Sequence, residues 1–172
     1  VVLTPSALSK YHITLDAKIS QKRKPGQSLE QWAAAKELKD EERQLLEAVA
    51  DLVHCIKLQT GVELQVESES KSAGPAIDLR ILKLFDNFAP ETFHLVVQPG
   101  SLQIDAIDLN GLRHGIYTLL SDHLDCHWFQ PGKIGEEFAI PADKTIRLPQ
   151  VDFHCVAHGK NSERHQLPSF HS

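Results

Sequence analysis

The stretch Asn110-Gly111-Leu112-Arg113-His114-Gly115-Ile116-Tyr117-Thr118-Leu119-Leu120 carries the most information about the fold of this chain. Asn110 is a typical N-cap residue, and apolar residues then recur at helical spacing up to an expected helix end near residues 123–125. Gly111 and Gly115 lie about one helical turn apart, where each glycine costs a helix about 1 kcal/mol. Because a missing side chain lets another backbone come close, we expect tight packing of this helix on its neighbours.

Short apolar segments on both sides of this helix predict β-strands, at residues 11–17, 64–66, 77–84, 93–97, 102–107 and 145–148. Residues 11–17 alternate between apolar and polar, which is typical of a half-buried strand. The segments at 93–97 and 102–107 flank Pro99-Gly100 and predict a hairpin. We find no periodicity of apolar residues in the tail at residues 150–172, so we expect it to be irregular and to cross a surface or fray.

A second helical region begins after Ser28, which forms a capping-box signature with Gln31. One unbroken helix over residues 29–59 would be about 46 Å long. This length exceeds the diameter of a small domain, so we expect a break near residues 39–41. The second half has its apolar residues on one stripe and ends at Gly61, a typical C-cap residue. We therefore expect this half to pack on a sheet.

This order of elements predicts an α+β fold, with one sheet and two main helices in a single domain at residues 1–149. The chain has 172 residues, which is short of the about 250 that a (β/α)₈ barrel needs. A net charge of -5 argues against a partner bound by bulk positive charge, such as a nucleic acid or an anionic membrane. The chain begins with Val1 and contains no methionine, from which we expect a processed protein or an excised fragment.

The region from Glu91 to Pro149 resembles the N-terminal domain that precedes the barrel in β-N-acetylhexosaminidases, α-glucuronidases and related glycoside hydrolases. Three features carry the resemblance in order: the Gly-x-x-x-Gly-Ile-Tyr-x-Leu-Leu helix at residues 111–120, the Trp128-Phe129-x-Pro131-Gly132 segment, and a closing strand at 146–149. The helix and strand at residues 45–66 are also similar to that family. Together these regions cover about two thirds of the chain.

The resemblance implies a zincin-like α+β domain, with helices on one face of a mixed sheet, that is not itself catalytic. In that family the catalytic carboxylates belong to a following barrel, so the resemblance implies that residues 150–172 lead toward a barrel and that the barrel is the partner of this domain. It favours an extracytoplasmic location, which the sequence leaves open. Two departures are the polar stretch at residues 21–42, which has no counterpart there, and Asp125, where the family usually has glycine.

We expect a structural or barrel-contact role for seven residues: Gly111, Gly115, Tyr117, Trp128, Phe129, Pro131 and Gly132. An alternative for Trp128 and Phe129 is a platform that stacks on a sugar ring, which would make the chain a glycan-binding module. We favour core or interface packing, because large aromatic side chains after a buried helix usually close the core.

A glycosidase needs two carboxyl groups on either side of a cleft. The nearest candidate pairs are Glu136 with Glu137 and Asp122 with Asp125, but neighbouring strand residues point to opposite faces and acids at a helix end usually face solvent. We therefore predict no catalytic residue in this chain.

A zinc set is a further alternative, since His123 and His127 are spaced as i and i+4. The residues that would complete it are Cys126, His154, Cys155 and His158. They lack the paired Cys-x-x-Cys spacing of a structural zinc site, so we expect ordinary histidines and no metal or cofactor. For the three cysteines we favour buried reduced thiols, with one bridge and one remaining thiol as the alternative.

Overall fold

A computed structural model of the chain describes residues 1–68, 74–82, 89–128, 136–138, 140–158 and 161–166. Its strands are β1 Val2–Leu3, β2 His12–Asp16, β3 Gln65–Glu67, β4 Ala76–Ile81, β5 Phe93–Gln98, β6 Ser101–Ala106, β7 Cys126–Trp128, β8 Glu136–Phe138, β9 Ile146–Arg147, β10 Val151–His158 and β11 Asn161–Gln166. Its helices are α1 Pro5–Leu8, α2 Leu29–Ala33, α3 Asp40–Thr60, α4 Leu109–Thr118 and the π-helical turn η2 Leu119–His123.

The centre of the fold is a seven-stranded mixed sheet in the order β11-β10-β5-β6-β4-β2-β3. Strands β3, β2, β4 and β6 run parallel to one another, while β5 pairs antiparallel with β6 and β10, and β11 pairs antiparallel with β10. Two small antiparallel pairs, β1 with β9 and β7 with β8, complete the pairing of the described strands. The predicted α+β class and the hairpin at β5 and β6 are confirmed.

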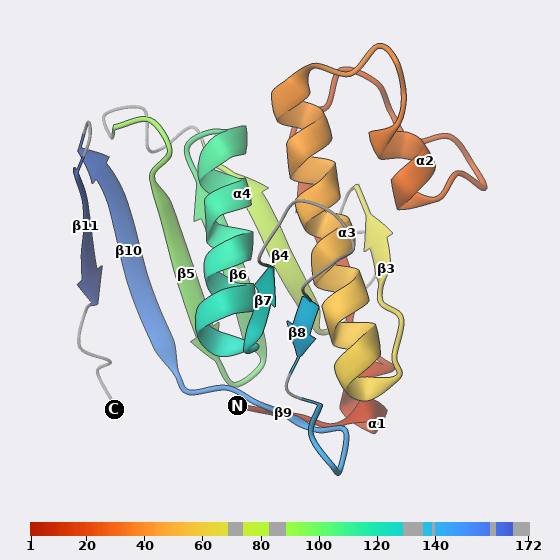
Figure 1. Cartoon of the computed structure of the whole chain (residues 1–172), viewed down its shortest axis with the longest axis vertical. Helices are drawn as coiled ribbons and strands as arrows, with labels where there is room; N and C mark the ends of the chain where they lie inside the picture. The colour runs from red at the N-terminus through yellow and green to blue at the C-terminus, as the bar shows by residue number, and fades with distance from the viewer. Residues whose placement is uncertain (69–73, 83–88, 129–135, 139, 159–160, 167–172) are drawn as a thin grey trace.

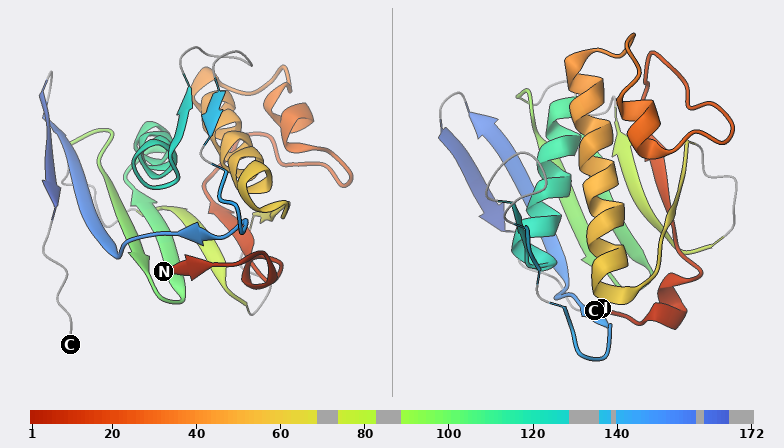
Figure 2. Two further views of the ribbon diagram at one scale, coloured as in Figure 1. Left: turned by 60° about the horizontal axis from the view of Figure 1, so that its bottom comes forward. Right: turned by 45° about the vertical axis from the view of Figure 1, so that its right-hand side comes forward.

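Helices α3 and α4 lie side by side on one face of this sheet (Figures 1 and 2). The strand positions that point toward the helices are almost wholly buried, among them Ile13, Leu79, Leu95 and Ile104. The alternate strand positions lie on the other face, which we call the open face. Because one face of the sheet is covered by helices, the core lies between the sheet and the helix layer.

The predicted start and break of the helical region are both confirmed. The Ser28 hydroxyl accepts from the N–H of Gln31, and the Gln31 side chain accepts from the N–H of Ser28, which caps α2. Helix α2 ends at Ala33 and α3 begins at Asp40. Gly61 ends α3 with φ of 80°, a left-handed conformation that glycine adopts without strain. Trp32 is buried, and it anchors the polar stretch at residues 21–42 to the domain.

The prediction of an irregular tail after residue 150 is wrong. Val151–His158 forms β10, which adds to the sheet beside β5, and Asn161–Gln166 forms β11 beside β10. A signal for β10 was present in the sequence, because Val151, Phe153 and Cys155 alternate with Asp152 and His154. The domain therefore extends beyond the expected boundary at residue 149.

Two local expectations also need correction. The N-cap of α4 is Asp108 rather than Asn110, because the Asp108 carboxylate accepts from the N–H of Gly111 at 2.7 Å and the helix begins at Leu109. At β2 the open face of the sheet is shielded as well, since His12 and Thr14 on that face are only 7% and 4% exposed. Period-two alternation reports which residues share a face, but it does not report what covers the polar face.

The favoured prediction of three reduced thiols is wrong as well. Cys55 of α3 and Cys126 of β7 form a disulfide with their sulfur atoms 2.04 Å apart, and Cys155 is a buried thiol. Sequence spacing gave no sign of this pair, because 71 residues separate the two cysteines and only the fold brings them together. Among the described helices, none combines the length and apolar character needed to cross a bilayer.

Candidate functional site

The two glycines of α4 lie where the helix backbone meets the sheet. A Cβ atom on Gly111 would lie 2.7 Å from the carbonyl oxygen of Thr92, and one on Gly115 would lie 2.5 Å from Cγ2 of Ile104. Both distances are shorter than real Cβ contacts, so only glycine fits at either position. These residues of the resemblance thus contact β5, β6 and the turn before β5 within the domain.

Tyr117 connects the two helices of the helix layer. Its hydroxyl donates a hydrogen bond of 2.8 Å to Oδ2 of Asp51 in α3. Burial, together with the hydrogen bond and the charge of Asp51, raises the pKa of the Tyr117 phenol far above its usual value. The phenol therefore stays protonated and acts as a fixed donor between α4 and α3.

The Trp128 segment is described only in part. Trp128 is the last residue of β7, where its backbone pairs with Glu136 of β8. Phe129, Pro131 and Gly132 lie outside the described residues. The start of β7 is held by the disulfide and by Gln59 of α3, whose amide donates a hydrogen bond of 2.6 Å to the carbonyl of Leu124.

Asp125, where the resembling family usually has glycine, has φ of 53°. This is the left-handed region that glycine adopts most readily and that aspartate tolerates better than most residues. Asp125 therefore has a backbone conformation that glycine would also adopt without strain.

The buried carboxylates of the described chain have structural partners. Glu42 accepts from the backbone N–H and the hydroxyl of Ser20, at 2.6 Å and 2.9 Å. Asp105 accepts two hydrogen bonds from the Arg80 guanidinium, at 2.8 Å and 3.0 Å. Asp122 and Asp125, one of the two acid pairs considered above, are both exposed.

The four residues of the zinc set whose side chains are described, His123, Cys126, His154 and Cys155, are not brought together. Cys126 is in the disulfide, and Cys155 points toward the core while His154, its neighbour in β10, lies on the open face. His123 lies in η2, where burial lowers its pKa and the charge of Asp122 opposes that shift. The side chains of His127 and His158 fall outside the described part of the structure.

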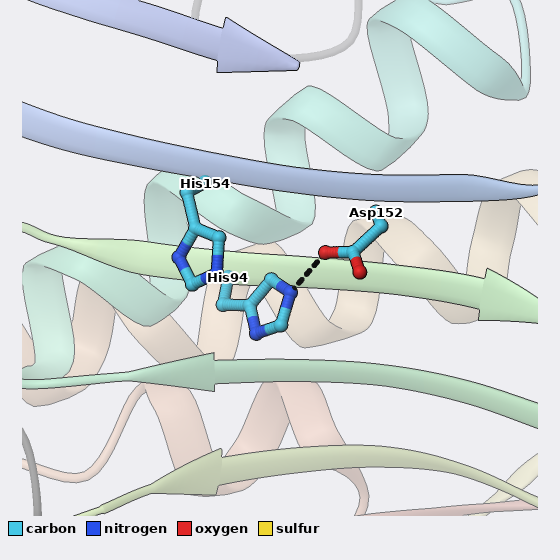
Figure 3. A group of neighbouring side chains, drawn as sticks. All are labelled: His94, Asp152 and His154. Carbon is cyan, nitrogen blue, oxygen red and sulfur yellow. Dashed lines mark hydrogen bonds and ion pairs between the residues drawn. The ribbon is translucent and has the colours of Figure 1, made fainter. Parts of the chain in front are cut away.

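A different cluster does form, on the open face where β5 meets β10. It consists of His94, Asp152 and His154 (Figure 3), with one ligand atom from each lying within 4.8 Å of the others. Nε2 of His94 lies 2.5 Å from Oδ1 of Asp152, and the His94 and His154 rings are stacked with centroids 3.7 Å apart. The three side chains are half-buried, so solvent reaches the cluster.

Strand register explains why these three residues meet. His154 is the direct cross-strand partner of His94, and Asp152 lies two positions earlier on the same face of β10. His94 is in turn the cross-strand partner of Asp105 of β6, which is held by Arg80 of β4. A row of charged and polar side chains therefore crosses the open face from β10 to β4.

The cluster has two chemical capabilities. At their close contact, the imidazole of His94 and the carboxylate of Asp152 can share a proton. Burial and the nearby His94 lower the pKa of His154, and Asp152 opposes this, so His154 favours its neutral form with a free lone pair. Two imidazole nitrogens and one carboxylate oxygen are also a donor set that suits a divalent transition-metal ion.

Sequence analysis missed this cluster. His94 was placed in a predicted strand but given no role, and Asp152 was assigned to the expected tail. His154 was grouped with cysteines that lie elsewhere in the fold. Recognising the alternation in residues 151–155 would have put Asp152 and His154 on one strand face, but the pairing of β10 with β5 is a property of the fold.

Comparisons with known proteins show a partial likeness. No protein-family model matches the chain, and no curated protein matches it. Two solved structures of mutant Streptomyces plicatus beta-hexosaminidase in complex with the product GlcNAc are similar to it, each with 30% sequence identity over 47% of this chain and a TM-score of 0.36. The match spans 15% of the length of each hexosaminidase chain. Over part of its length, then, the chain is similar to a glycoside hydrolase.

Proposed function

We propose that this chain is a non-catalytic N-terminal accessory domain of a hexosaminidase-like glycoside hydrolase, with a zincin-like arrangement of helices on a mixed sheet. Its role is to pack on a (β/α)₈ barrel that carries the catalytic carboxylates, and to stabilise that barrel. The observation that carries the proposal is the close packing of Gly111 on the turn before β5 and of Gly115 on β5 and β6, because these two residues of the resemblance build the domain instead of lining a reaction site. The structural partners of Glu42 and Asp105 support the same role.

Activity measurements on the chain alone test the non-catalytic part of the proposal. We expect no hydrolysis of aryl glycosides of N-acetylhexosamine or glucuronic acid by the purified 172-residue chain. Turnover above the blank that scales with protein concentration would overturn the proposal. The matched sample is the chain after heat denaturation, which reports the background of the assay.

The reading frame beyond Ser172 tests the presence of a barrel. We expect a continuation of about 250 residues with alternating strands and helices. In that longer protein, removing residues 1–166, which include β10 and β11, should lower the thermal midpoint of the barrel, because the surface that packs on this domain becomes exposed to water. An unchanged midpoint and unchanged activity would rule out a stabilising role.

A glycan-binding module is the alternative that Trp128 raises, and fluorescence distinguishes it from the accessory role. The chain has two tryptophans, and the indole N–H of Trp32 donates a hydrogen bond of 2.7 Å to the carbonyl of Gln21 in a buried position. A sugar that stacks on Trp128 would change its emission but not that of Trp32. A response to chito-oligosaccharides that Trp128→Ala abolishes would favour the binding module.

A further inference from the structure

We propose that His94, Asp152 and His154 form a binding site for one zinc-class divalent metal ion on the open face of the sheet. The proposal goes beyond the accessory role and does not depend on it. It uses a donor set different from the six residues considered in the sequence, of which only His154 is shared.

Backbone register places the three donors, His94, Asp152 and His154, close together. Directly opposed residues of an antiparallel pair carry Cβ atoms about 5 Å apart, and His94 and His154 are such a pair. Asp152 projects from the same face of β10, two residues before His154. Two adjacent strands of one sheet therefore fix the three donors, and no long loop has to be ordered to bring them together.

The distances between the donor atoms are close to those in a zinc site. Ligands of a tetrahedral zinc ion, with bonds of about 2.0–2.1 Å, lie about 3.4 Å from one another. In the cluster they lie within 4.8 Å, and Nε2 of His94 is 2.5 Å from Oδ1 of Asp152. An ion placed between His94 and Asp152 would widen their contact by about 1 Å, and the stacked His154 ring would turn about its side-chain torsions to complete the set.

The three ligand side chains are of types that zinc binds, and solvent can reach them. Two imidazoles with one carboxylate match the three-ligand sites in which zinc keeps a fourth position for water. The side chains of His94 and Asp152 are 20% and 42% exposed, so an ion can enter from solvent. Asp105, the neighbour of His94 on β6, is held by two hydrogen bonds from Arg80, which leaves Asp152 as the carboxylate of the site.

The backbone register also connects the site to the C-terminal strands. His165 of β11 is the cross-strand partner of His154, so histidines occupy paired positions on β11, β10 and β5. A metal ion bound between His94 and His154 would join β10 to β5 and thus fasten the C-terminal strands to the rest of the sheet. Zinc binding should therefore slow hydrogen exchange of the β10 amides.

Calorimetric titration of the tag-free, EDTA-treated chain with Zn²⁺ tests the site. We expect one ion per chain, and at least about tenfold weaker binding in both Asp152→Asn and His154→Gln, because even the loss of an outer partner of a metal ligand costs about 10–100-fold in affinity. The matched control is His54→Gln, an exposed histidine on α3, which should bind as the parent does.

Two results would overturn the proposal. One is the absence of Zn²⁺ binding by the folded parent chain, and the other is parent-like affinity in a folded Asp152→Asn or His154→Gln variant. Circular dichroism of each metal-free variant establishes that it is folded. If one variant fails to fold, the other still decides the outcome, because each removes one of only three donors.

Discussion

The disulfide between Cys55 and Cys126 joins the C-terminal half of α3 to the first residue of β7. Gln59, one turn after Cys55, donates to the carbonyl of Leu124 beside the same junction. A covalent bond and a buried hydrogen bond thus hold the chain where it leaves η2. The segment that carries Trp128 therefore starts from a fixed point.

Removing this disulfide should lower the stability of the domain. It closes a loop of 71 residues, and the chain-entropy argument assigns about 4 kcal/mol to a loop of that size. We expect Cys55→Ala with Cys126→Ala to lower the free energy of unfolding by about 2–4 kcal/mol in urea titrations.

Thiol counting supplies the control for that experiment. The denatured parent should show one reactive thiol without reduction, that of Cys155, and three after reduction. Three reactive thiols before reduction would contradict the bridge, and any loss of stability in the double variant would then need another cause.

Alanine at the α4 glycines should be destabilising although alanine is the better helix former. Gly111→Ala brings a Cβ to 2.7 Å from the backbone oxygen of Thr92, which has little room to move. Gly115→Ala meets a methyl group of Ile104, which can move only by disturbing the core. Overpacking costs about 1–3 kcal/mol, and at contacts this short we expect a cost above the about 1 kcal/mol gained in helix propensity.

Thermal or urea unfolding of Gly111→Ala and Gly115→Ala measures this balance. Asn110→Ala is the control, because Asn110 directly precedes Gly111 in α4 and is half-exposed, and it should change stability by less than about 0.5 kcal/mol. Stabilisation by either glycine substitution would show that α4 does not approach the sheet as closely as described.

Structural features that depend on neighbouring residues could be predicted from this sequence, and features that depend on long-range contacts could not. The Ser28 and Gln31 capping box, the Gly61 C-cap and the β5–β6 hairpin were predicted because each depends on residues a few positions apart. The Cys55–Cys126 bridge depends on a contact across 71 residues, which no local pattern encodes.

The candidate site shows the same division. The alternation of Val151, Phe153 and Cys155 with Asp152 and His154 was readable, although we did not use it. That β10 pairs with β5, in a register that puts His154 opposite His94, follows from the assembled sheet. Sequence reasoning could therefore have found the face of the strand, but not the partner across it.

His123 should have a pKa below its ordinary value near 6.5, because burial disfavours the charged imidazolium. The negative charge of Asp122 acts in the opposite direction. Asp122→Asn should therefore lower the pKa of His123 further, which NMR titration of the imidazole protons measures. Glu91→Gln, beside the N-cap residue Asp108 at the start of α4, serves as the control and should leave the pKa of His123 unchanged. A rise in Asp122→Asn would contradict the charge effect of Asp122.

Glu42 should make stability depend on pH below about 4.5. The Glu42 residue is 3% exposed. Burial alone would raise the pKa of its carboxyl, but hydrogen bonds from Ser20 and Lys39 together with the charge of Lys39 outweigh burial and lower it. A carboxyl with a lowered pKa in the folded state stabilises it above the unfolded pKa, near 4.5, and loses that contribution as the pH falls through the folded value.

Glu42→Gln should therefore cost about 2 kcal/mol at pH 7, the range for hydrogen bonds to charged groups, and progressively less as the pH drops below about 4.5. Urea unfolding at a series of pH values measures both quantities. Glu41→Gln is the matched control, because Glu41 is exposed in the same turn of α3 and should change stability by less than about 0.5 kcal/mol. Since Glu42 connects Ser20 to the start of α3, a pH-independent difference would mean that its side chain acts there by packing and not by charge.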